Sequence, residues 1–207
     1  MLTKSGENLL LEKESYTNKG VTLIEMLVAV TVFSITVGAI SGLFISGIRS
    51  QRRVLATQEL LNQTSYVLEY TGRALRMAKK DDSLGSCTGT PHLNYVKTES
   101  GNGIRFLNHQ TKCQEFRLNT TTFQLEVRES TDYTSGNLPA SWTDLTSDKL
   151  HVNSFNVNLS GATQPPADYL QPRVTIFLEI EGRETGVGRP KIQIQTSISQ
   201  RDLDVQY

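Results

Sequence analysis

The apolar positions of this chain are concentrated in one long stretch, residues 26–48. These 23 residues contain no Asp, Glu, Lys, Arg or His; fifteen are apolar and the others are Gly, Ser or Thr. A helix of that length spans roughly 34 Å, enough to cross a hydrocarbon core of about 30 Å. The stretch is longer than the apolar region of a secretory signal peptide, about 7–15 residues. We therefore expect a retained membrane helix, with a buried core helix of a soluble domain as the alternative.

The same helix is expected to continue well beyond the apolar stretch. No proline occurs before Pro91, so the pattern predicts one helix over 21–78, with its transmembrane part at about 21–48. Past the apolar stretch, apolar residues recur every seven positions and form a narrow stripe: Val54, Leu61, Leu68 and Leu75, with Leu60, Val67 and Ala74 beside them. We expect this stripe to pack on the rest of the chain. A parallel coiled-coil dimer is the alternative.

Residues 79–207 alternate between apolar and polar positions, which is typical of strands. Strands are expected at 104–106, 116–118, 123–127, 150–159, 174–180 and 192–198. The apolar phase changes near Asn153 and Ser154, which predicts a β-bulge there. Loops are expected over 131–147, 161–172 and 181–190. A helix followed by antiparallel strands predicts an α+β fold.

Composition narrows the possible functions. Lys+Arg and Asp+Glu number 21 each, so the formal net charge is zero and nucleic acid is not an expected partner. No second long apolar run exists, which excludes a polytopic membrane protein. The three histidines, His92, His109 and His151, are isolated, and the sequence has no zinc, P-loop or nucleophile-elbow motif. We therefore expect no metal, no cofactor and no catalytic activity.

Glu25 is the unusual residue of the helix, because it lies at the start of the apolar stretch. A carboxylate within a membrane costs a few kcal/mol unless it finds a partner. Such an acid is a functional candidate. The alternative is a side chain that extends to the lipid headgroups and has no function.

The segment Lys19-Gly20-Val21-Thr22-Leu23-Ile24-Glu25 resembles the processing motif of type IV prepilins and type II secretion pseudopilins. That motif is a Gly, an apolar residue, Thr or Ser, Leu, Ile or Val, and Glu, followed by a long apolar run. The resemblance is specific from Lys19 to about Ile48. It implies a pilin-like fold, in which the long N-terminal helix packs on an antiparallel sheet in an extracytoplasmic head, residues 79–207.

The resemblance also implies how the chain is processed. Prepilin peptidase would remove a leader of residues 1–20 by cutting between Gly20 and Val21, and Val21 would then be N-methylated. Glu25 would pair with the new N-terminal amine of a neighbouring subunit during assembly. Two departures from the family pattern are Val at position 21, where Phe or Met is commoner, and a leader with no net charge (Lys4, Lys13, Lys19 against Glu7, Glu12, Glu14).

Four small residues inside the apolar stretch, Ser34, Gly38, Gly42 and Ser46, are spaced by four. This spacing places them on one side of the helix, where they would allow close packing against neighbouring helices. The alternative is that membrane helices simply tolerate glycine.

The two cysteines, Cys87 and Cys113, are expected to form a disulfide if the head is exported. Such a bond would close a loop over 25 residues, worth about 3 kcal/mol on the chain-entropy estimate. The alternative is two reduced thiols.

Together these patterns favour a minor pilin or pseudopilin, a structural subunit that assembles into or primes a type IV pilus-like filament. Its expected partners are prepilin peptidase, other pilin or pseudopilin subunits, the inner-membrane assembly platform and membrane lipid. It would begin as a single-pass inner-membrane protein with its head outside, and then enter a pilus or pseudopilus. The alternatives are a J-type pseudopilin of a type II secretion system and a membrane-anchored binding protein that never polymerises.

Overall fold

The structure is a computed structural model that describes residues 20–98, 101–131, 138–163, 170–183 and 189–201. The chain divides into two compact units, Met1–Gly47 and Ile48–Tyr207, which are called here the N-terminal unit and the C-terminal unit. Residues 1–19, nearly all of the expected leader, lie outside the described residues.

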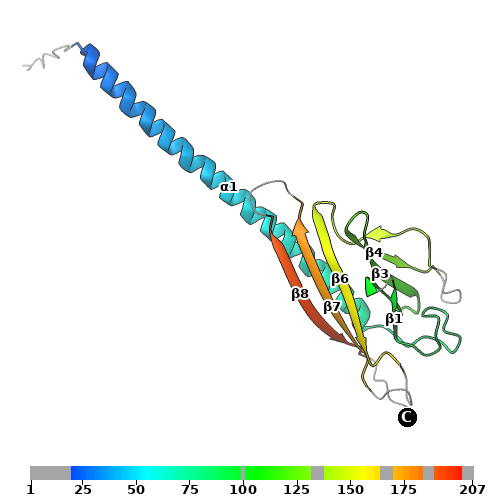
Figure 1. The fold of residues 1–207 in the computed structure, drawn as a ribbon. Coiled ribbons are helices and arrows are strands. Elements are labelled where there is room, and N and C mark those ends of the chain that lie inside the picture. Colours follow the sequence, from blue (N-terminus) through cyan, green and yellow to red (C-terminus); the bar gives the residue numbers. More distant parts are fainter. Residues whose placement is uncertain (1–19, 99–100, 132–137, 164–169, 184–188, 202–207) are drawn as a thin grey trace, which may run out of the picture. The chain divides into compact units, whose positions relative to one another are not determined.

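One long helix, α1 (Leu23–Arg76), follows the expected course over 21–78 (Figure 1). Thr22 caps its start: the Glu25 backbone N–H donates to Thr22 Oγ1 (3.3 Å), and the Met26 N–H donates to the Thr22 carbonyl (3.2 Å). A hydroxyl in this position satisfies a backbone donor that the first turn leaves unpaired. Thr22 therefore has a local role, which is to cap the start of the helix.

The described part of the N-terminal unit contains no core. Residues 20–47 are all exposed, including large side chains such as Phe33 (69%) and Leu43 (76%). Serine hydroxyls in this unit donate to carbonyls one turn earlier in the helix: Ser34 Oγ donates to Val30 O and Ser41 Oγ donates to Val37 O, both at 2.8 Å. By length and composition, α1 is able to cross a membrane. A helix with its polar groups satisfied internally and its apolar groups outward suits lipid.

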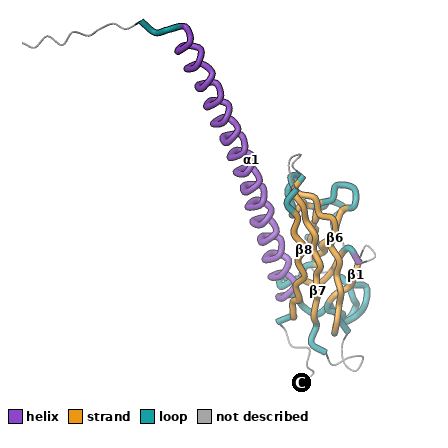
Figure 2. The backbone as a smooth tube through the Cα atoms, turned by 60° about the vertical axis from the view of Figure 1, so that its left-hand side comes forward, coloured by secondary structure: helices purple, strands orange, loops and turns teal. Residues whose placement is uncertain are grey.

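The C-terminal unit contains two antiparallel sheets (Figure 2). The five-stranded sheet has the order β1-β2-β3-β4-β5, and the three-stranded sheet has the order β6-β7-β8. The strand bounds are β1 Tyr95–Thr98, β2 Gly103–Leu107, β3 Cys113–Asn119, β4 Gln124–Glu129, β5 Thr143–Asp144, β6 Leu150–Ser160, β7 Arg173–Gly182 and β8 Lys191–Ser199. The long helix and the antiparallel sheets confirm the α+β, pilin-like fold.

Several sequence expectations about the strands can be compared with the structure. The β6–β7 register shifts between Val152 and Ser154, which confirms the predicted bulge. Phe123 was expected to begin a strand, and this is wrong: it has a positive φ of 58° and precedes β4. The expected loop over 131–147 contains β5, and Thr146 near its end is buried. Residues 132–137, 164–169 and 184–188 of the three expected loops lie outside the described residues.

The helix packs on the sheets partly through the expected stripe, because Leu60, Val67 and Leu75 are buried and Leu68 and Ala74 pack against the core. Its buried residues are Leu60, Thr64, Val67, Thr71, Gly72 and Leu75. Val54 and Leu61, from the predicted stripe, are 52% and 49% exposed. Two threonines occupy buried places because their hydroxyls bond to carbonyls one turn back, Thr64 to Leu60 (2.6 Å) and Thr71 to Val67 (2.7 Å). With the hydroxyl satisfied in this way, a threonine packs through its methyl group.

The end of α1 is joined to distant parts of the chain through its last carbonyls. The hydroxyl of buried Tyr95 donates to Leu75 O (2.7 Å), and the Arg201 N–H donates to Arg76 O (2.8 Å). Just beyond the helix, Gln200 Nε2 donates to Ala78 O (2.8 Å). The Arg201 N–H and Gln200 Nε2 satisfy carbonyls that a helix end otherwise leaves unpaired, while Leu75 O also accepts from the Ala78 N–H (3.3 Å).

Candidate functional site

The first candidate site is the start of α1. Gly20 and Val21 precede the helix and are exposed, Val21 by 64%. Thr22 is the cap, and Glu25 lies in the first turn. The peptide bond proposed for cleavage therefore lies just before the first helical residue.

Glu25 stands among exposed apolar side chains, including Leu23 (84%), Ile24 (70%) and Met26 (58%). No residue in the described part of the chain forms a hydrogen bond or ion pair with its carboxylate. The next 23 residues along the helix, 26–48, carry no charge. Residues 20–48 of the described structure therefore offer no cationic side chain that could neutralise Glu25.

The row of small residues lies on this same exposed segment. A Cβ built on Gly38 or Gly42 meets no atom within 4 Å, and Ser34 and Ser46 are exposed. Within the described structure, no part of the chain covers this row. The structure thus places the four residues on an open helix surface and leaves their packing role a prediction.

The disulfide lies in the C-terminal unit. Cys87 and Cys113 are joined, with an S–S distance of 2.02 Å, and both are buried. The bond ties the loop after α1 to the first residue of β3. Asp81 orders this loop by accepting from the Thr88 N–H (2.6 Å) and the Thr88 hydroxyl (2.7 Å). Beside it, hydrogen bonds from the Ser86 hydroxyl and backbone lower the pKa of Asp82.

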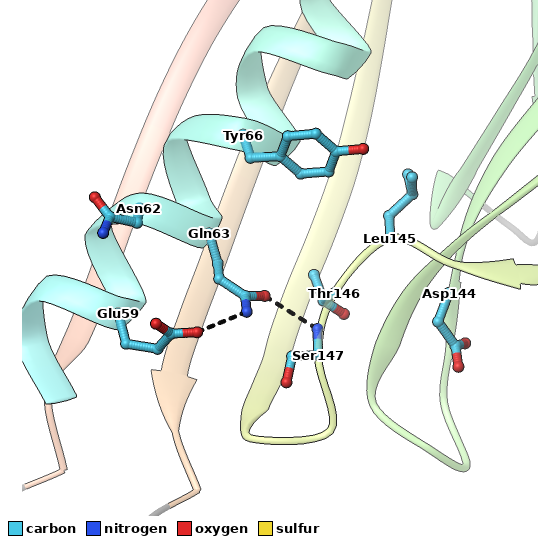
Figure 3. A pocket seen from close by; sticks show the side chains of 8 residues that line it. All are labelled: Glu59, Asn62, Gln63, Tyr66, Asp144, Leu145, Thr146 and Ser147. Atoms are coloured by element: carbon cyan, nitrogen blue, oxygen red, sulfur yellow. Dashed lines mark hydrogen bonds between the residues drawn. The ribbon is translucent and has the colours of Figure 1, made fainter.

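A groove of about 450 Å³ lies beside α1 in the C-terminal unit and was not expected from the sequence (Figure 3). Its lining residues are Glu59, Asn62, Gln63, Tyr66, Asp144, Leu145, Thr146 and Ser147. Gln63 bridges the two sides, because its Nε2 donates to Glu59 Oε1 (2.9 Å) while its Oε1 accepts from the Ser147 N–H (3.1 Å). The amide is occupied in holding the helix to the segment before β6, which indicates a structural role.

A cluster of arginine and glutamate side chains on β2, β3 and β4, with Trp142 beside them, was also not expected from the sequence. Glu115 Oε2 accepts from Arg105 (3.2 Å) and Arg128 (2.6 Å), and its side chain is only 1% exposed. The guanidinium groups of Arg128 and Arg117 stack on Trp142 at 4.2 and 3.8 Å. The sequence shows alternating charges in these strands, but it does not show the cross-strand register that brings the charged side chains together. The cluster pairs its charges internally and presents no nucleophile beside a base.

Among the described residues, no group of three His, Cys, Asp or Glu side chains could hold a metal ion. Burial raises the pKa of the Tyr70 phenol, which lies edge-on to Phe116, with 6.0 Å between ring centroids. That phenol is part of the packing between helix and sheet.

Comparison with known proteins gives one match, which covers the N-terminal site. No curated protein and no solved structure matches the chain. Residues 16–41 match a family described as the prokaryotic N-terminal methylation motif. The matched segment contains Gly20, Val21, Glu25, Ser34 and Gly38. This match supports a type IV prepilin-like family for the chain.

Proposed function

We propose that this protein is a minor pilin or pseudopilin, a non-catalytic subunit that assembles into or primes a type IV pilus-like filament. The observation that carries the proposal is the methylation-motif match over residues 16–41, at the start of a helix whose apolar surface no described residue covers. A filament of packed helices would supply the missing contacts. The small-residue row at Ser34, Gly38, Gly42 and Ser46 would allow neighbouring helices to approach closely.

The proposed processing creates the partner of Glu25. Prepilin peptidase cuts between Gly20 and Val21, removing residues 1–20, and Val21 becomes the methylated N-terminus. An α-amino group has a pKa of about 7.7–8.0, so it is mostly cationic at neutral pH. Pairing this amine with Glu25 of a neighbouring subunit neutralises two charges that are costly in an apolar environment.

The proposed topology follows from the same motif. The transmembrane part, about 21–48, stands in the inner membrane among lipid and beside the assembly platform, and the head, about 79–207, is outside the cytoplasm. The Cys87–Cys113 disulfide supports this placement, because disulfides persist in oxidising compartments.

The test compares three forms of the full chain expressed with prepilin peptidase and a filament machine: wild type, Glu25→Gln and the control Glu69→Gln. Glu69 is an exposed acid of the same helix, outside the apolar stretch, and pairs with Arg73. Intact-mass analysis of membrane-extracted protein should show Val21 first in all three forms. Glu25→Gln should be processed but absent from sheared filaments, whereas Glu69→Gln should enter them.

Two results would contradict the proposal. A mature chain that still carries residues 1–20 would favour the anchored binding protein that never polymerises. Incorporation of Glu25→Gln at the level of Glu69→Gln would remove the assembly role of Glu25.

A further inference from the structure

The strand β8 forms a long open edge of the three-stranded sheet. It lies at the end of the order β6-β7-β8, and no strand of the described chain pairs with its other side. From Ile192 to Ser199 it contains no proline and no charged residue, and its register with β7 is continuous. Natural sheets usually protect such edges with charges, prolines or bulges. By contrast, the edge strand β1 has four residues, one of them Lys97.

The register shows which backbone groups of β8 are free to bond. At the two ends of the β7–β8 pair, the Gln200 N–H donates to Pro172 O and the Gly182 N–H donates to Pro190 O, each at 3.0 Å. Bonded positions alternate along an antiparallel pair. The even-numbered residues of β8 therefore bond to β7, and the odd-numbered ones direct their N–H and C=O outward: Lys191, Gln193, Gln195, Ser197 and Ser199.

A cationic groove adjoins the end of this edge. Figures 1 and 2 both show β8 beside the last turns of α1, and Ile198 Cδ1 lies 3.8 Å from where a Cβ would stand on Gly72. The groove, of about 420 Å³, is lined by Leu68, Glu69, Gly72, Arg73, Arg76, Met77 and Arg201. Glu69 is paired with Arg73 (2.5 Å), while Arg76 and Arg201 are exposed and form no ion pair in the described structure.

We propose that the β8 edge and this groove together bind an extended acidic segment of a partner protein. The segment adds to β8 as an antiparallel strand through the outward groups of Gln193, Gln195 and Ser197. Acidic residues at its N-terminal end then lie at Arg76 and Arg201, because an antiparallel strand begins where β8 ends. Main-chain bonds supply affinity in this mode of binding, and side-chain pockets supply selectivity. The inference goes beyond the proposed subunit role, since peptide binding is measurable on the full chain without a filament.

The test uses the full chain in detergent and a labelled probe peptide, acetyl-Asp-Asp-Thr-Val-Thr-Val-Thr-Val-amide. We expect saturable binding by fluorescence anisotropy. Replacing the two Asp by Lys should abolish it, and so should replacing the two internal Val by Pro, which removes ladder donors. Because residues 202–207 follow the groove in sequence, a form ending at Arg201 is measured in parallel.

Two variants locate the bound peptide. Gln195→Pro removes an outward N–H without breaking a bond to β7, a position where edge strands tolerate proline. It should weaken binding by at least about fivefold, whereas the control Gln195→Thr keeps the N–H and should bind normally. Arg76→Gln with Arg201→Gln should weaken binding about tenfold and make it insensitive to salt, with Glu59→Gln as the charge control.

Two results would overturn the proposed binding of an acidic segment. Absence of probe binding to both the full chain and the form ending at Arg201 would overturn the proposal. Equal binding of the acidic, Lys and Pro peptides would also overturn it, because that result indicates nonspecific apolar association. If Gln195→Pro lowers the melting temperature, the Pro-containing peptide decides the same question on the unchanged protein.

Discussion

Leu27 and Leu60 lie on the same helix, yet Leu27 is 59% exposed and Leu60 is 0% exposed. Leu27 belongs to the N-terminal unit, in which the described residues are all exposed, and Leu60 belongs to the core of the C-terminal unit. In the C-terminal unit even two polar residues of the helix, Thr64 and Thr71, are buried, with 2% and 1% exposure. Apolar composition therefore predicts that a surface must be covered, but the covering surface need not belong to the same chain.

The largest predicted effect is a difference in stability between one substitution in each unit. Leu60→Ala should lower the free energy of unfolding of the C-terminal unit by about 2–5 kcal/mol, through lost burial and a cavity. Leu27→Ala should leave that free energy unchanged, because Leu27 is 59% exposed and its unit has no core among the described residues. Urea denaturation of the full chain in detergent, followed by the single Trp142, measures both. Equal losses would show that the units share a core, which would break the comparison.

The second prediction concerns the covalent link, which only the C-terminal unit has. Replacing Cys87 and Cys113 by Ser should cost the head about 3 kcal/mol on the chain-entropy estimate, since 25 residues are then released from the closed loop. Circular dichroism during urea denaturation provides the measurement, with reductant added to the wild type as the control. A variant as stable as the wild type would assign loop order to Asp81 and Asp82 alone.

The smallest predicted effect tests the hydrogen bond between Tyr95 and the C-terminal end of α1. Tyr95→Phe removes the hydroxyl that donates to Leu75 O and should cost about 1 kcal/mol, because a buried hydrogen bond is lost while the Ala78 N–H (3.3 Å) still donates to that carbonyl. Tyr66→Phe is the matched control on the exposed side of α1, where Tyr66 is 57% exposed, and it should cost almost nothing. The same urea denaturation reports both. A null result for Tyr95→Phe would mean that the Ala78 N–H alone satisfies Leu75 O.

Sequence periodicity predicted the elements well where one residue spacing had one explanation. The alternation in 174–180 and 192–198 gave β7 and β8, and the change of apolar phase gave the bulge in β6. The buried face of α1 was predicted in part: Leu60, Val67 and Leu75 are buried as expected, but hydropathy alone ranks Leu61 above Thr64. Thr64 is buried because its hydroxyl is satisfied within the helix, which a hydropathy pattern does not represent.

Long-range features could not be predicted from local patterns. The short β5 forms only because Thr143 and Asp144 pair with β4, and nothing in their own sequence requires a strand. The Gln63 bridge joins residues 84 positions apart, and the stacking of Trp142 on two arginines depends on strand register. The N-terminal site was predictable because its determinants, from Gly20 to Glu25, are contiguous in sequence.

The bonds at the end of α1 also define a path for mechanical load. A pull along the helix reaches the head through the carbonyls of Leu75, Arg76 and Ala78, which accept from Tyr95, Arg201 and Gln200. Two of these donors follow β8, so a pull on the helix acts on the end of the three-stranded sheet as well as on the covalent chain between α1 and β1.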